Sequence, residues 1–180
     1  MLRNRDIKHT KKSWLWTILG LCSLSSVTMC TSGGAQPPPP PQLGRAEVNE
    51  WLACTECTNG ELKKVLGLGN DAVRDLAQVF DATVFGKFLL SYTRLLEDQW
   101  RRQVVAAKED PSLAPDLSKE QYVKIYAANL TVRYQSRATT ALSRIATPEA
   151  RKVLSDARTQ VKDRRVQGLI DQALKTPIAK

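Results

Sequence analysis

The sequence predicts an all-α protein of about five to seven helices. Apolar residues recur at spacings of three and four along most of the chain after residue 45, which is the period of an amphipathic helix. No stretch of useful length alternates apolar and polar residues as a half-buried strand would. Several segments open with a helix-capping pattern and meet across very short turns, so sequential helices are expected to be antiparallel neighbours.

The sharpest local pattern is the C-x-x-C of Cys54 and Cys57, within residues 51–80. Three apolar residues at helical spacing predict a helix just before it: Val48, Trp51 and Leu52. After it, Thr58 and Glu61 match a capping box, with Thr58 as the N-cap of the next helix.

Two short helices are predicted after the cysteines. Leu62, Val65 and Leu66 form the apolar face of the first, and Gly67 and Gly69 indicate its end. Asn70 or Asp71 is expected to cap the second helix. Its inward residues are predicted to be Val73, Leu76, Ala77 and Phe80.

Two long helices come next. The first is predicted over residues 84–108, and Pro111 and Pro115 place a loop at residues 109–117. Ser118 and Gln121 form a second capping box and start the other long helix. The apolar stripes of the two helices are Phe85, Phe88, Leu89, Tyr92, Leu95, Leu96, Gln99, Trp100 and Val104, and Tyr122, Ile125, Tyr126, Leu130, Ala138, Ala141, Leu142 and Ile145.

The last helix is predicted to start at Thr147-Pro148-Glu149, which combines an N-cap, a proline in the first turn and an acid. It is expected to run to Pro177, with Gly168 as the place where it loosens or divides.

Two segments carry a family resemblance. Residues 138–154 read A-x-x-A-L-x-x-I, a turn and then A-x-x-x-L, and residues 69–76 show a similar join. Together with W-L-x-C-x-x-C-T-x-G-E-L at residues 51–62, this resembles exported bacterial HEAT-repeat-like proteins, a class of α-solenoid. The resemblance implies antiparallel helix pairs that bind other proteins through exposed helix faces.

Residues 1–35 have the composition of a signal peptide or an amino-terminal membrane anchor. Five basic residues come first, and residues 14–30 then form an uncharged, largely apolar run of 17 residues. Gly33 and Ala35 provide small residues for cleavage after Ala35. Lipidation at Cys30 is an alternative, although the residues just before it fit that signal poorly. We therefore expect export to the periplasm or cell envelope.

The charge balance changes if this leader is removed. It holds five of the 27 basic and one of the 18 acidic residues, so the rest of the chain carries +5 instead of +9. This mild charge argues against a nucleic-acid partner. His9 is the only histidine, and without it the chain cannot build a Ser-His-Asp triad or a histidine-containing metal site.

Residues 36–44 are predicted to be a linker, and residues 45–180 the helical domain. Five consecutive prolines at residues 37–41 favour an extended polyproline II rod of roughly 3 Å per residue. The rod is expected to act as a spacer of about 15 Å.

Two interpretations of Cys54 and Cys57 stay open. In an oxidising compartment a disulfide is expected, either as a structural staple between two helices or as a redox-active pair with a low-pKa thiol at a helix N-terminus. The staple is favoured because no βαβ pattern surrounds the motif. A zinc site would need two further ligands, which the chain after the leader does not supply. Covalent haem attachment would need a histidine at the position of Thr58. No metal or cofactor is expected.

Two surfaces are candidates for contact with a partner. Basic residues near the carboxyl terminus could meet an anionic membrane or an acidic protein, although interleaved acids also fit a solvated face: Arg151, Lys152, Arg158, Lys162, Arg164 and Arg165. An aromatic and basic set forms the other, although the spacing of its first two members favours core packing: Tyr122, Tyr126, Tyr134, Arg133 and Arg137.

These observations predict a non-enzymatic protein-binding or scaffold domain at the cell envelope, with a protein partner that the sequence does not identify. The alternatives are a thiol-disulfide exchange protein that uses Cys54 and Cys57, and a peripheral membrane-surface protein that uses the basic carboxyl-terminal helix.

Overall fold

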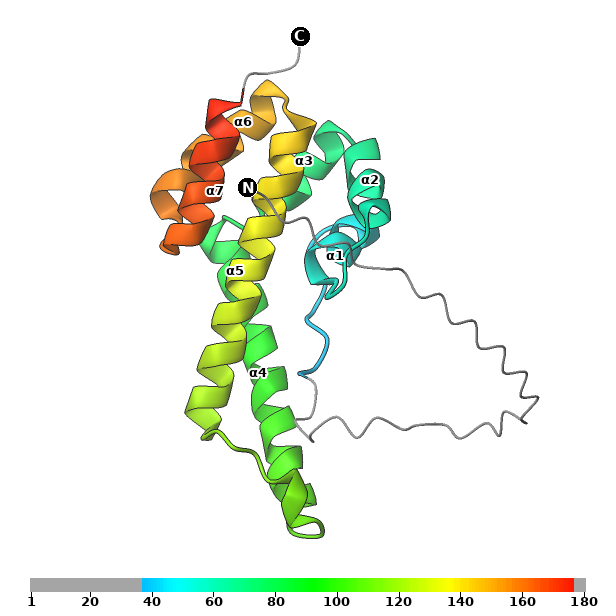
Figure 1. Ribbon diagram of the computed structural model, residues 1–180, viewed down its shortest axis with the longest axis vertical. Coiled ribbons are helices and arrows are strands. Elements are labelled where there is room, and N and C mark those ends of the chain that lie inside the picture. Colours follow the sequence, from blue (N-terminus) through cyan, green and yellow to red (C-terminus); the bar gives the residue numbers. More distant parts are fainter. Residues whose placement is uncertain (1–36, 177–180) are drawn as a thin grey trace, which may run out of the picture. The chain divides into compact units, whose positions relative to one another are not determined.

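A computed structural model describes residues 37–176 (Figure 1), and this part of the chain is helical throughout, without a strand. Its seven α-helices are α1 (Ala46–Ala53), α2 (Asn59–Gly67), α3 (Asn70–Ala77), α4 (Ala82–Ala106), α5 (Lys119–Ile145), α6 (Pro148–Gln160) and α7 (Arg164–Lys175). A 3-10 helix, η1 (Pro111–Leu113), lies between α4 and α5. The all-α prediction is confirmed, and the helices are consistent with an α-solenoid-like fold. The predicted leader, its cleavage site and Cys30 lie outside the described residues.

Helix α5 is the element that the other helices share. It packs against each of the other α-helices, and Figure 1 shows α4 lying along it. Its buried residues at helical spacing include Leu130, Tyr134, Ala138 and Leu142, which are at most 2% exposed. The apolar residues of α5 are buried against all of these neighbours, and this burial explains why one long helix holds the domain together. No helix among the described residues has both the length and the hydropathy that crossing a membrane requires.

The predicted helix starts are confirmed where a capping box was expected. The Thr58 hydroxyl accepts the Gly60 N–H at 3.0 Å, and the Glu61 carboxylate accepts the Thr58 N–H at 2.8 Å. Ser118 and Gln121 bond reciprocally in the same way at the start of α5. Each box satisfies amide groups that have no partner inside the helix.

The cap expected for α3 is wrong. Gly69 occupies the N-cap position with φ +53° and no side-chain bond, while Asn70 and Asp71 lie inside the helix. The turn from α2 satisfies the first amides instead, because the Asp71 N–H donates to the Leu68 carbonyl at 3.1 Å. The Asp71 carboxylate is therefore available for a different bond.

The final helix divides at a different place from the one expected. The break lies between Gln160 and Arg164, and Gly168 is an ordinary residue of α7. Asp163 caps α7 by accepting the Arg165 N–H at 2.9 Å and the Val166 N–H at 3.3 Å. A strong N-cap starts a new helix more effectively than one glycine interrupts an old one.

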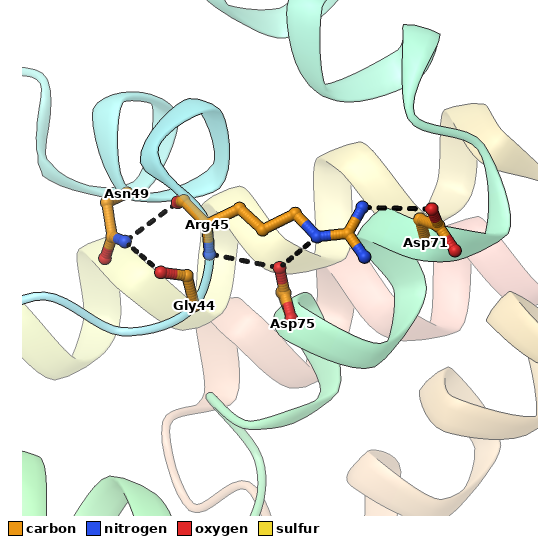
Figure 2. Close-up of polar contacts among 5 residues, drawn as sticks. All are labelled: Gly44, Arg45, Asn49, Asp71 and Asp75. Carbon is orange, nitrogen blue, oxygen red and sulfur yellow. Dashed lines mark hydrogen bonds and ion pairs between the residues drawn. The ribbon is translucent and has the colours of Figure 1, made fainter.

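A polar cluster fixes the chain where it enters α1 (Figure 2). Asp75 of α3, which is 8% exposed, accepts the Arg45 N–H at 3.1 Å, and its carboxylate lies 3.5 Å from Arg45 Nε. Asp71 binds the same guanidinium at 3.0 Å, and the Asn49 amide donates to the carbonyls of Gly44 and Arg45 at 2.8 Å. Gly44 has φ +85°, and a Cβ there would lie 2.8 Å from Asp75, so only glycine fits. The segment that precedes α1 is thus bound to α1 and α3.

Candidate functional site

The Cys54–Cys57 turn joins α1 to α2. The two sulfur atoms lie at disulfide-bonding distance, and the two Cα atoms are 5.6 Å apart. Both cysteines are partly buried against the core, whereas Thr55 and Glu56 between them are exposed. The predicted pairing is therefore present in the structure, and the exposed tip of the turn leaves it accessible from one side.

Arg137 of α5 holds this turn through the backbone carbonyls of α1 and Cys54. Its guanidinium donates to the carbonyls of Trp51 at 3.2 Å, Leu52 at 2.9 Å and Cys54. The guanidinium carbon lies 5.8 Å from the centre of the Trp51 ring, and the Trp51 indole N–H donates to the Arg137 carbonyl at 3.1 Å. Arg137 thus satisfies the carbonyls at the end of α1, which have no partner within the helix.

The electrostatics of the turn distinguish its two sulfur atoms. Cys54 is the C-cap of α1, where the negative end of the helix dipole disfavours a thiolate. Cys57 directly precedes Thr58, the N-cap of α2, where the positive end favours one. The redox interpretation therefore has its best attacking thiol in Cys57.

The guanidinium beside this turn also has a shifted pKa. Burial, together with the nearby charge of Arg133, lowers the pKa of the Arg137 guanidinium below its usual value.

Most of the basic residues predicted to meet a membrane or partner are bonded to the domain itself. Arg151 donates to the carbonyls of Leu174 and Thr176 and so binds the end of α7. Three others form ion pairs: Lys152 with Asp156, Arg158 with Asp171, and Arg165 with Asp163. Lys162 and Arg164 have no ion pair among residues 37–176. The membrane hypothesis stays a prediction, with these two residues as its clearest candidates.

The aromatic residues of the second candidate surface belong to the core, as their spacing indicated. Tyr122 is 4% exposed and its ring centre lies 4.5 Å from that of Tyr126, while Tyr134 is fully buried. Tyr134 packs its ring 5.3 Å from Phe88 of α4. Its hydroxyl has no hydrogen-bond partner in the described chain, and burial raises its pKa to about 12.

Two surface hollows were not predicted. The first, called here the apolar groove, has a volume of about 580 Å³ and lies between the start of α4, the middle of α5 and the turn from α6 to α7. The second, the arginine hollow, has a volume of about 840 Å³ and lies beside the Cys54 turn. Both fall in the size range of ligand sites in proteins. Neither could be located from helical periodicity, because each is built by residues far apart in the sequence.

The apolar groove is walled by aliphatic and aromatic side chains: Val79, Phe80, Phe85, Leu89, Val132 and Val161. Its rim carries Asp81, Lys162 and Asp163. The two carboxylates cap α4 and α7 through backbone amides, so their charges are partly satisfied. Lys162 makes no ion pair among the described residues, and the groove is therefore an apolar channel with one unpaired positive charge at its edge.

The arginine hollow is built from four segments: the proline run at residues 37–40, the Cys54 turn, Arg102 of α4 and Arg133 of α5. Three of these four prolines are half-buried. No group of three or more histidine, cysteine, aspartate or glutamate residues suited to a metal ion occurs in the part of the chain that the structure describes.

Comparison with known proteins identifies no relative: no family model, no curated protein and no solved structure matches this chain. The fold and these sites are thus the basis for any functional inference.

Proposed function

We propose that this chain is a non-enzymatic, helical protein-binding domain of the cell envelope, and that it holds an amphipathic helix of another protein in the apolar groove. The groove is the observation that carries the proposal. The amino-terminal sequence pattern and the HEAT-like joins support the envelope location and the binding role.

The shape and lining of the groove favour a helix as its occupant. Two long helices, α4 and α5, form its sides, and a third helix fits between two others by placing residues at spacings of three, four and seven in the channel. Phe85, Leu89 and Val132 offer the apolar surface that such residues bury.

The charge at the rim defines the occupant further. Lys162 lines the groove and has no ion pair in the described chain, whereas Asp81 and Asp163 are engaged as helix caps. The proposed partner helix therefore carries an acidic residue at the edge of its apolar stripe, where it meets Lys162.

Two glycines allow a sharp test of the groove. Gly86 lines it, and a Cβ on Gly86 would meet nothing within 4 Å, so Gly86→Leu is expected to add an apolar side chain at the groove without backbone strain. Gly168 of α7 has equally open surroundings and does not line the groove, so Gly168→Leu is a matched control. Both changes replace a helical glycine and should preserve the fold.

The experiment selects binders to the full-length protein from a displayed library of amphipathic helical peptides. Selected peptides should bind the wild type and Gly168→Leu alike, and lose about tenfold or more in affinity with Gly86→Leu. Lys162→Glu should weaken the peptides that carry an acidic rim residue. Selection of no peptide, or equal binding to Gly86→Leu, would contradict the proposal.

The envelope location has a separate test. The intact mass of the protein recovered from cells should correspond to cleavage after Ala35, or to retention in the membrane fraction if the segment is an anchor. Recovery of the uncleaved chain in the soluble cytoplasmic fraction would refute it.

Thiol-disulfide exchange is a second candidate, favoured by the place of Cys57 just before the N-cap of α2. It requires a Cys57 thiol that alkylates readily near neutral pH after mild reduction. A disulfide that resists mild reductant, with thiols that alkylate only near pH 8.5 or above, would leave the staple interpretation.

A further inference from the structure

The arginine hollow contains two guanidinium groups that no carboxylate of the described chain neutralises. Arg102 comes from α4 and Arg133 from α5, and neither takes part in an ion pair or a side-chain hydrogen bond among residues 37–176. Other arginines do have such partners, for example Arg101 with Asp98 at 2.9 Å. Exposed arginines elsewhere in the described chain, such as Arg164, also lack a partner. This hollow differs because two such arginines line it together and because the Nε atom of Arg133 is buried.

Arg133 supplies the strongest evidence for a missing partner. Its Nε atom is buried and has no hydrogen-bond acceptor in the described part of the chain. A buried donor without an acceptor destabilises a fold, so each such group calls for an explanation. Arg137 lies one helical turn further along α5, and its charge adds to the positive potential around Arg133.

The remaining polar groups of the hollow are suited to an anion. Tyr92, Gln99 and Thr55 line it and carry hydroxyl or amide hydrogens that can be donated. Arg133 also acts on Tyr92, since its charge opposes the rise that burial causes in the pKa of the Tyr92 hydroxyl. Glu50 is the carboxylate among the lining residues, and Lys64 binds it at 2.9 and 3.2 Å.

The proline run completes the hollow as a wall. The polar cluster of Figure 2 binds Gly44 and Arg45, and Leu43 beside it is 4% exposed and donates its N–H to the Asn49 side chain. Residues 37–40 are thus held beside α1 at their carboxyl-terminal end, and prolines lose little conformational entropy on being ordered. The proline run is thus a lining segment of the hollow that is bound to the domain at one end.

We propose that the arginine hollow binds an oxyanion, a carboxylate or phosphate group, between Arg102 and Arg133. The anion accepts hydrogen bonds from both guanidinium groups, whose planar arrangement of donors matches the paired oxygens of these groups. It also supplies the acceptor that Arg133 Nε lacks. This site is separate from the apolar groove, and its success or failure does not depend on the proposed protein partner.

The test titrates the ¹⁵N-labelled full-length protein with inorganic phosphate and, separately, with glutarate, at constant ionic strength. The arginine Nε–H signals of Arg102 and Arg133 should shift and saturate with one common affinity, while those of Arg101 and Arg158 stay unchanged. Tighter binding of phosphate would indicate a phosphate ester as the natural ligand, and tighter binding of glutarate a carboxylate.

Two neighbouring substitutions separate a built site from general attraction to positive charge. Arg102 is exposed, so Arg102→Gln should leave the fold intact and weaken binding about fivefold or more. Arg101→Gln removes the same charge one residue earlier on α4, outside the hollow, and should change the affinity by less than about twofold. Three outcomes would overturn the proposal. The shifts fail to saturate, they appear equally on all exposed arginines, or both substitutions change the affinity alike.

Discussion

Arg133 and Arg137 lie one turn apart on α5, yet their surroundings are opposite. Arg137 donates to three carbonyls at the end of α1 and stacks on Trp51. Arg133 lines an open hollow, and its buried Nε has no acceptor in the described chain. The same residue type on the same helix thus holds the fold together at one position and is left available at the other.

The difference comes from what each arginine meets. The end of α1 presents several carbonyls that the helix cannot satisfy, and Nη1 of the Arg137 guanidinium lies among three of them. Arg133 lines its hollow together with the Cys54 turn and the proline run, and the carboxylate there, Glu50, is bound by Lys64. A half-buried guanidinium is therefore evidence of a structural role only when its acceptors are identified.

The largest expected effect comes from breaking the satisfied arginine. Arg137→Gln should lower the free energy of unfolding by about 3 kcal/mol, because it leaves carbonyls at the end of α1 without donors and removes the stacking on Trp51. Arg133→Gln should change it by less than about 1 kcal/mol, since it removes a group whose donor is already unsatisfied. Urea unfolding at pH 7 measures both.

The control for this pair is Arg94→Gln, on the exposed face of α4. It should lie within about 0.5 kcal/mol of the wild type. Equal losses for Arg137→Gln and Arg133→Gln would show that the two arginines contribute alike, and the structural contrast would then have no energetic meaning.

The next effect tests whether the disulfide or Arg137 holds the turn. The bond between Cys54 and Cys57 closes a very short loop, so reducing it should lower the free energy of unfolding by about 2 kcal/mol. This is less than the loss expected for Arg137→Gln, because the guanidinium still binds the Cys54 carbonyl after reduction. Unfolding with and without reductant measures the effect, and the double substitution Cys54→Ala, Cys57→Ala should reproduce it. If reduction lowers the free energy of unfolding more than Arg137→Gln does, the disulfide and not Arg137 is the main contact that holds the turn.

The sequence predicts most of the helices because their signals are local. The capping boxes at Thr58 and Ser118 are four-residue patterns, and each is present as expected. The long helix predicted at residues 84–108 is α4, Ala82–Ala106, which starts earlier because Asp81 accepts the N–H groups of Thr83 and Val84. Competition between two local signals explains the error in the last helix, where the cap at Asp163 prevails over Gly168.

The sites could not be predicted in the same way because they depend on contacts between distant residues. Arg137 meets the Cys54 turn 83 residues away along the chain, and no local pattern indicates this. Apolar periodicity also overestimates burial, since Leu95 and Ile125 are 39% and 43% exposed although both belong to the predicted stripes. The cysteine pair was predictable because both partners lie within one turn.

The smallest effect extends the comparison to Tyr134, the neighbour of Arg133, whose buried hydroxyl also lacks a partner. Tyr134→Phe should leave the free energy of unfolding at pH 7 unchanged or raise it by up to about 1 kcal/mol, because it removes an unsatisfied polar group and keeps the ring packing on Phe88.

At alkaline pH the stabilities of the wild type and of Tyr134→Phe should diverge. Burial raises the pKa of Tyr134 from 10.0 to about 12, so between these values the unfolded chain releases a proton that the folded chain retains, and the wild type loses stability as the pH rises. At pH 11 this loss is about 1.4 kcal/mol, and Tyr134→Phe should be free of it. Urea unfolding at pH 7 and at pH 11 measures both effects. A loss of more than about 1 kcal/mol in Tyr134→Phe at pH 7 would show that the Tyr134 hydroxyl has a hydrogen-bond partner. Tyr134 would then resemble the satisfied Arg137 and not the unsatisfied Arg133.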